Sequence, residues 1–278
     1  METWIELALE QSGDGGAHPR ASGTPGTGGG EGPGGHDAVV APGAGSAPPA
    51  VLALSGPLSE VTAHQLVGRL CQLLQRYRAI VVDVSGVRLT HSGAVYAFAE
   101  AASRAGEWPE VRLVVAAANA TMAALLVSSR VAQRVPVHPD VATASAHLDE
   151  RPELVRSSWQ FDVDAHAPGE ARGHVRRVCG RWSVDEEARE AAEIVVTELV
   201  TNAVEHAASA SVVEAERRGD TFLLRVRDFD LAPLPEAHLP DPRSPRGRGL
   251  AMVAAVASAW GVESHRDGKT VWAELTTA

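Results

Sequence analysis

The sequence has very little lysine. Lys269 is the only lysine among 25 basic residues, which leaves 24 arginines, and 35 acidic residues give a formal net charge of −10. Proteins that bind nucleic acid present a basic face. The composition therefore argues against direct nucleic-acid binding, and we attribute the excess of arginine to coding composition rather than to function.

Cysteine and long apolar runs are also scarce. Cys71 and Cys179 fall in different predicted domains beside apolar helical positions, so we expect two reduced core residues and no disulfide. No apolar run approaches the roughly 20 residues that cross a bilayer, and Met1 begins an acidic segment rather than a basic leader. These absences favour a cytoplasmic protein without membrane contact.

The first 50 residues divide into two unlike parts. Within residues 1–10, Ile5, Leu7 and Leu9 alternate with polar or small residues, which is the period of a strand with one buried face. Residues 11–50 consist mainly of glycine, alanine, proline and serine, and they lack the apolar side chains that offset the entropy of ordering. We expect an edge strand followed by a disordered segment.

Residues 51–148 alternate between strand and helix patterns. Strands are predicted at 51–54, 79–84 and 111–116, and helices at 59–78, 92–104, 121–129 and 141–148. The second strand is apolar without regular alternation, which is typical of a strand covered by helices on both faces. The pattern predicts an α/β domain over 1–148, a polar linker at 149–158 and a second domain over 159–278.

One helix of the second domain carries polar side chains in a row. Between Glu193 and His206 the apolar residues recur at helical spacing, and Glu198, Asn202 and His206 stand at i, i+4 and i+8, on one side. An amide oxygen can bind Mg²⁺, and a carboxylate one turn away can take a proton from a hydroxyl or a water. The alternative is a solvated polar stripe. We expect His206 to pack or cap near the helix end.

Two hairpins and a loop follow this helix. Apolar runs within 210–226 predict a hairpin whose second strand delivers Asp228 at its end. The five prolines of 229–246 exclude a helix or a central strand, and so this segment is predicted to be a binding loop. The turn of the last hairpin, at Asp267-Gly268, is predicted to be of type I′.

Two glycines stand before an apolar helix predicted at 250–260. Gly247 and Gly249 let backbone amides approach a phosphate, and the helix dipole favours the anion. Arg248 and Lys269 are candidate charge contacts, with simple solvation as the alternative.

The order of these parts resembles the GHKL ATPase superfamily. Glu198 with Asn202 is similar to its N-box, Asp228 to its adenine-binding aspartate, and Gly247-Arg248-Gly249-Leu250 to its G2 box. The segment ELVTNAVEHA is most similar to the bacterial anti-sigma-factor serine kinases. The resemblance covers residues 159–278 and implies a Bergerat-type α/β sandwich that binds ATP and Mg²⁺.

The resemblance also implies a role for each residue. Asn202 would hold Mg²⁺ against the triphosphate, and Glu198 would act as general base on a serine hydroxyl. Asp228 would accept a hydrogen bond from the adenine amine. Backbone amides near Gly247 and Gly249 would face the phosphates.

The chain departs from the family two residues after the aspartate. The family usually has glycine there, and this chain has Asp230. Aspartate tolerates a left-handed backbone better than most residues, but it places a negative charge near a polyanion. We therefore expect either weak ATP binding or a different arrangement of the loop.

The first domain resembles a STAS domain (sulfate transporter and anti-sigma antagonist) in its order of elements and in the run DVSGVRLTHSGAVYAF. In the antagonist branch, a serine at the start of the helix after the second core strand is phosphorylated, and Ser92 matches it by position. Ser92 also suits a helix N-cap, which is the structural alternative. The family's Asp-Ser-Ser-Gly is replaced here by Thr-His-Ser-Gly at 90–93.

Together the two resemblances imply a two-domain α/β regulatory fusion. We expect it to transfer the γ-phosphoryl group of ATP to a serine of a STAS-domain antagonist, either its own first domain or another chain's. A sigma factor would be the competing partner, and relatives of the kinase domain commonly form dimers. A linker of about ten residues would give the two domains an effective concentration in the mM range. The alternatives are a non-catalytic scaffold and an ATPase in which Glu198 activates water.

Overall fold

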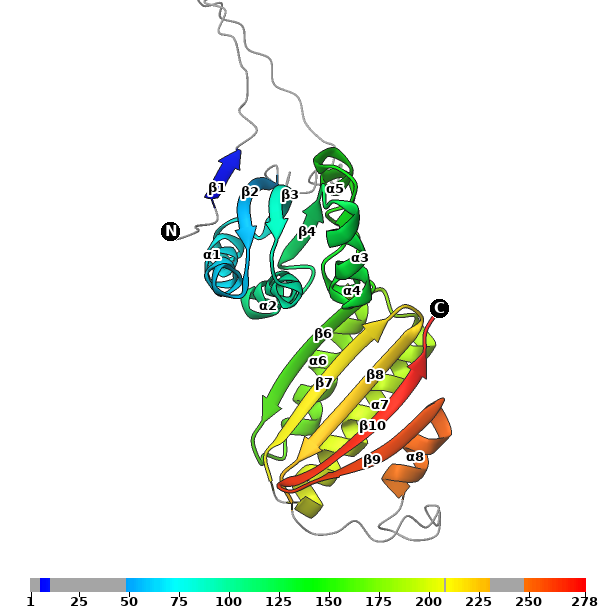
Figure 1. Cartoon of the computed structure of the whole chain (residues 1–278). Coiled ribbons are helices and arrows are strands. Elements are labelled where there is room, and N and C mark those ends of the chain that lie inside the picture. Colours follow the sequence, from blue (N-terminus) through cyan, green and yellow to red (C-terminus); the bar gives the residue numbers. More distant parts are fainter. Residues whose placement is uncertain (1–5, 11–48, 208, 231–247) are drawn as a thin grey trace, which may run out of the picture.

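The described part of the chain forms two five-stranded sheets, each with its own helices. The structure is a computed structural model, and it describes residues 6–10, 49–207, 209–230 and 248–278. Figure 1 shows the first domain stacked on one end of the second. The two-domain α/β architecture is confirmed.

The first sheet has the strand order β1-β2-β3-β4-β5. β1 pairs antiparallel with β2 at the edge, and the other neighbours are parallel. The strands are β1 (Glu6–Glu10), β2 (Ala50–Leu58), β3 (Ala79–Leu89), β4 (Arg112–Ala116) and β5 (Val137–His138). We expected residues 11–50 to be disordered, and residues 11–48 of this segment lie outside the described residues.

Helices cover both faces of this sheet. They are α1 (Glu60–Tyr77), a 3-10 turn η1 (Ser92–Val95), α2 (Tyr96–Ala105), α3 (Ala120–Ser128), α4 (Val131–Arg134) and α5 (Val141–Ala146). Ile80 and Val82 pack toward α1 and α2, while Ala79 and Val81 pack with Ala144 of α5. This two-sided burial explains why the β3 sequence is apolar without alternation.

The second sheet is antiparallel and has the order β6-β7-β8-β10-β9. Its strands are β6 (Leu154–Phe161), β7 (Ser211–Arg218), β8 (Thr221–Asp228), β9 (Ala259–His265) and β10 (Gly268–Thr276). The helices α6 (Ala167–Arg181), α7 (Glu186–Asn202) and α8 (Arg248–Val256) pack on one face. Along β7 and β8 buried residues therefore alternate with half-buried ones.

Two predictions about connections were wrong. The linker predicted at 149–158 ends at Glu153, because β6 begins at Leu154 and pairs along its whole length with β7. Its residues appeared polar because one face of this edge strand is not buried. The turn between β9 and β10 is not type I′, which needs positive φ at both central residues. Those residues are Arg266 and Asp267, and neither has a positive φ.

Among the described residues, no helix combines the length and the apolar composition that a membrane crossing requires.

Asp185 fixes the start of α7. Its carboxylate accepts from the backbone N–H of Ala188 at 3.0 Å and of Ala278 at 2.8 Å. The Ala188 bond is the largest of the causes that lower the pKa of Asp185 to about 2, followed by the Ala278 bond and the Thr277 side chain. An unperturbed aspartate has a pKa near 3.9. The charged form is therefore the one that the folded state favours.

We predict that Asp185→Ala lowers the melting temperature at pH 7, because the cap of α7 is lost. Since the folded pKa is depressed, this contribution is present above pH ~4 and is lost as the pH falls toward about 2. The difference between the two proteins in thermal unfolding should shrink over that window. Glu190→Gln, on an exposed position of the same helix, is the control; an equal effect of both changes would contradict the assignment.

Candidate functional site

The last two turns of α7 carry Glu198 and Asn202. Leu199 and Val200 are buried in the core of the second domain, so the opposite side of the helix faces outward. Glu198 and Asn202 are both half-buried, and Asn202 is the last residue of α7. Neither is turned fully into packed hydrocarbon. Both polar groups remain available at one end of the domain.

The helix changes its period immediately after Asn202. Residues Ala203–Ala207 form a π-helical turn, which is wider than an α-helical turn and often marks a functional site. His206 lies in this turn, so the α-helical spacing that aligned it with Glu198 and Asn202 does not extend to it. The side chain of His206 is outside the described part of the structure.

Gly249 brings the start of α8 against these two side chains. A Cβ built on Gly249 would stand 2.8 Å from Oε2 of Glu198 and 3.5 Å from Nδ2 of Asn202. At 2.8 Å something must shift, and the nearest atom is the end of the flexible Glu198 side chain, so a larger residue at 249 would displace that carboxylate from its present position. Gly249 therefore lies directly beside the polar face of α7 that carries Glu198 and Asn202.

The rest of the glycine motif is only partly described. Gly247 and the segment 231–247, which includes most of the proline-rich loop, lie outside the described residues. Arg248 is the first residue of α8, and its backbone places it beside Gly249; its side chain is not described.

Asp228 is the last residue of β8, and its side chain is only 9% exposed. Lys269 stands directly opposite on β10, with Nζ 3.2 Å from Oδ2 of Asp228 and 3.8 Å from Oδ2 of Asp230. The backbone N–H of Asp230 donates to Oδ1 of Asp228 at 3.2 Å. Lys269, predicted as a charge contact, thus lies beside two carboxylates at the Asp228 end.

Gly268 has a role that its position at a turn does not reveal. Its φ is +144°, and a Cβ there would stand 2.0 Å from the carbonyl oxygen of Asp228 and 2.8 Å from Cα of Phe229. No side chain fits that gap. The glycine therefore lets the beginning of β10 approach the end of β8, and it helps to set Lys269 opposite Asp228.

Ser209 joins the two halves of the site. Its backbone N–H donates to the carbonyl of Ala203 at 3.5 Å, and its Oγ accepts from the N–H of Phe229 at 3.1 Å. The residue after Asn202 and the residue after Asp228 are thus bridged by one serine. Sequence reasoning missed Ser209, because a small polar residue between a helix and a strand carries no distinctive signal.

Ser92 lies in the other domain. It is exposed and is the first residue of η1, after β3. The N-cap of this turn is His91, whose side chain makes no capping hydrogen bond. The reading of Ser92 as an N-cap is therefore wrong, and its hydroxyl is accessible at the surface.

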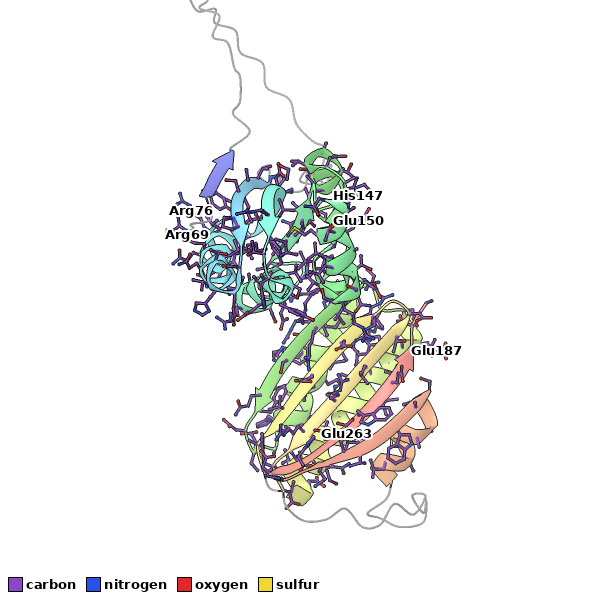
Figure 2. All side chains as sticks on the ribbon, in the orientation of Figure 1. Arg69, Arg76, His147, Glu150, Glu187 and Glu263 are labelled. Atoms are coloured by element: carbon purple, nitrogen blue, oxygen red, sulfur yellow. The ribbon has the colours of Figure 1, made fainter. Side chains whose placement is uncertain are left out.

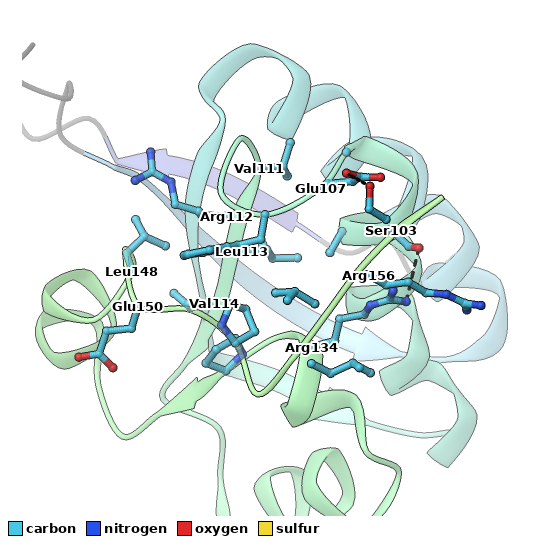
Figure 3. Close-up of a pocket in the computed structure, with 18 of the residues that line it drawn as sticks. Ser103, Glu107, Val111, Arg112, Leu113, Val114, Arg134, Leu148, Glu150 and Arg156 are labelled. Atoms are coloured by element: carbon cyan, nitrogen blue, oxygen red, sulfur yellow. Dashed lines mark hydrogen bonds between the residues drawn. The ribbon is translucent and has the colours of Figure 1, made fainter. Parts of the chain in front are cut away.

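A separate cavity of about 300 Å³ lies between the two domains (Figure 3). Arg134, Glu107 and Val114 line it from the first domain, and Arg156 and Ser157 line it from the second. Burial and the neighbouring charge of Arg156 lower the pKa of Arg134. None of the residues predicted for nucleotide binding lines this cavity, so it is distinct from the site at Glu198.

Comparisons with known proteins agree with this division. Residues 161–275 match a family model described as histidine kinase-like ATPase domain. Residues 44–137 match a family model described as "Mlab, STAS domain". A comparison with curated proteins finds no match.

One similar solved structure is that of the RsbU and RsbW domains of Rv1364c from Mycobacterium tuberculosis. The identity is 20%, the match covers 44% of this chain and 32% of that chain, and the TM-score is 0.35. The chain spans about a third of the length of that relative.

The family matches and the geometry define the class of protein: an α/β protein that joins two different modules. In particular, this chain holds a STAS-like domain followed by a histidine kinase-like (GHKL) ATPase domain. An ATPase domain of this kind implies ATP binding, usually with Mg²⁺.

We predict that Gly249→Ala weakens ATP binding by about tenfold, because the added methyl group would displace the Glu198 carboxylate and crowd the Asn202 amide at the start of α8. Isothermal titration calorimetry with ATP and Mg²⁺ measures the effect. Gly180→Ala is the matched control, since a Cβ there meets nothing within 4 Å and alanine favours a helix. Unchanged affinity in Gly249→Ala would exclude the start of α8 from the site.

Proposed function

We propose that this protein is an ATP-dependent serine kinase of the partner-switch type, which acts on a STAS-domain protein. The observation that carries the proposal is the approach of Gly249 to both Glu198 and Asn202. This approach brings three kinds of group together. The start of the helix provides backbone N–H donors, the carboxylate can act as a base, and the amide can bind a metal ion.

The proposed reaction moves one phosphoryl group. The serine Oγ of the substrate forms a bond to the γ-phosphorus of ATP, the bond from that phosphorus to the bridging oxygen breaks, and ADP leaves. The serine proton passes to the carboxylate of Glu198, which acts as general base. The half-buried position of Glu198 at the end of α7 suits this role.

Asn202 is suited to be the one side-chain ligand that the protein provides to a magnesium ion. The described residues contain no group of three or more His, Cys, Asp or Glu that could hold a metal ion. The amide oxygen of Asn202 would therefore bind the ion together with phosphate oxygens and water, as Mg²⁺ commonly does. The ion would supply charge neutralisation on the triphosphate.

Asp228 is the proposed adenine contact. It is buried at the end of β8, and Ser209 connects that end to the end of α7. Its carboxylate already receives the ammonium of Lys269 and the N–H of Asp230. The adenine amine would share an oxygen with these donors.

The same ion pair favours a second candidate function, a non-catalytic scaffold. Lys269 offsets the charge that Asp230 adds, but it also engages the acceptor that adenine needs. A domain of this kind would bind ATP weakly or not at all and act through protein contacts. Binding without phosphoryl transfer would identify a nucleotide-gated scaffold.

The proposed partners follow from the two modules. A STAS-domain antagonist would provide the serine, and Ser92 is the candidate acceptor within this sequence, since its hydroxyl is exposed. A sigma factor would be the partner that competes for the ATPase domain, with the consequence of transcription control. A cytoplasmic location and a homodimer are part of the same proposal.

We predict that Glu198→Gln lowers the rate of transfer from γ-labelled ATP to a STAS substrate by about 10²–10⁴-fold, the usual contribution of a general base. Its ATP affinity in calorimetry should stay near that of the parent protein, because the amide has the same shape. Glu190→Gln, on the exposed side of α7, should leave both quantities unchanged. A transfer rate that Glu198→Gln does not reduce would contradict the kinase proposal.

Asp228→Asn should instead reduce ATP affinity, because a carboxamide can present its NH₂ group where adenine needs an acceptor. We expect the loss to be at least tenfold for ATP in calorimetry, with little change for inorganic triphosphate, which has no base. Equal loss for both ligands would show that Asp228 acts on the fold rather than on adenine.

A further inference from the structure

The first domain packs an aromatic side chain against the second. Trp108 comes from the loop 106–111 between α2 and β4, yet it packs against the hydrophobic core of the ATPase domain. The indole N–H of Trp182, a fully buried residue of that core, donates to the carbonyl oxygen of Trp108 at 3.4 Å. The loop thus contacts the second domain through both its side chain and its backbone.

Polar contacts surround this aromatic anchor. Glu107 accepts a hydrogen bond from the buried hydroxyl of Ser157 on β6, and Glu110 pairs with Arg181 at 2.8 Å. Gln133 of α4 also donates to Glu153, just before β6, at 3.0 Å. An exposed ion pair such as Glu110–Arg181 contributes little stability by itself, but together these contacts fix the orientation in which the half-buried Trp108 packs against the second domain. We call the segment of residues 106–111 the docking loop.

The docking loop and Ser92 lie at opposite ends of the parallel strands of the first sheet. β3 and β4 are parallel neighbours, so the chain between them leaves the C-terminal end of β3 and returns to the N-terminal end of β4. Ser92 begins this connection and the docking loop ends it. The candidate phosphoacceptor therefore faces away from the ATPase domain.

The nucleotide site is also remote from the contact. Arg217, next to the β7–β8 turn, donates to the carbonyl of Trp182 beside the docking loop. Asp228 lies at the other end of β8, seven residues beyond Thr221, which corresponds to about 24 Å at ~3.4 Å per residue. In Figure 1 the first domain and α8 accordingly stand at opposite ends of the molecule.

The connection between the domains is short. It comprises Asp149 to Glu153, since β6 begins at Leu154. Five extended residues span at most about 18 Å. Together with the docking loop, this short connection keeps the first domain at the Thr221 end of β8, so Ser92 stays away from the glycine of α8 while the docking loop is in place.

We infer that the docking loop holds the STAS-like domain so that phosphoryl transfer occurs between chains: the ATPase domain of one molecule acts on a serine presented by another. This inference rests on the proposed kinase function and names its partner as a separate STAS domain, either that of a second copy of this chain or that of another protein. Transfer follows the bond changes already described, with the acceptor hydroxyl supplied by the second molecule.

The geometry can be tested without any activity. Spin labels at Ser92→Cys and Glu263→Cys, in the full chain with Cys71→Ala, report the distance between the acceptor and the nucleotide end. Glu263 is exposed on β9 (Figure 2), and Cys179 is buried, with a pKa raised to about 12 by burial, so it should not react. We expect one distance distribution centred at roughly 40 Å or more, about two sheet lengths.

Trp108→Ala should broaden that distribution, because the anchor of the docking loop is removed. Tyr96→Ala is the control, since it removes an aromatic side chain of the same domain that is 53% exposed. A population of the parent protein below about 20 Å would overturn the inference whatever the kinase activity. No broadening in Trp108→Ala would overturn the role of the docking loop.

The activity test uses a mixture of two full-length variants. Ser92→Ala keeps the proposed base but lacks the acceptor, and Glu198→Gln keeps the acceptor but lacks the base. With γ-labelled ATP, label on the Glu198→Gln chain in the mixture, and a parent rate per molecule that rises with concentration, support transfer between chains. Label only on an added STAS protein supports it as well.

Self-labelling of the parent protein that is independent of concentration, with no label on either variant in the mixture, overturns the inference. Absence of label on every chain and added STAS protein overturns the kinase proposal and this inference together, while the distance measurement still reports on the docking.

Discussion

The close packing of α8 on α7 at Gly249 is the contact on which the proposed chemistry depends. Because no Cβ intervenes, the first turn of α8 reaches the side chains of Glu198 and Asn202. Ser209 then ties the end of α7 to the end of β8, where Asp228 is buried. Groups from three separate elements therefore converge at one end of the second sheet, and each depends on a small residue at a tight contact.

Lys269 gives this site a feature that the family pattern does not supply. The only lysine of the sequence stands between Asp228 and Asp230, and it offsets part of the charge that the aspartate in place of glycine introduces. The β10 backbone can bring it there because Gly268 allows a close approach to β8. The ion pair between Lys269 and Asp228 is also the strongest argument for weak nucleotide binding, and for this reason a non-catalytic scaffold remains the alternative to the kinase.

Much of the fold and part of the site could be predicted from local patterns. The apolar run of β3 revealed a sheet covered on both faces, and the spacing of Glu198 and Asn202 revealed a shared helix face. Boundaries were less accessible: β6 was taken for a linker because an edge strand with one unburied face looks polar, and the turn before Gly268 was taken for type I′ because the glycine's tertiary role is invisible locally. Ser209 carried no signal at all.

Local patterns along the chain were enough to identify the two modules, the order of their motifs and the residue types that each motif brings. This was possible because helix and strand periods are local and because the motifs are short. The ends at which the two modules meet became visible only from the packing between the domains. Packing of the half-buried Trp108 against the neighbouring core sets the first domain and α8 at opposite ends of the molecule, and such long-range apolar contacts leave no trace in the spacing of residues along the chain.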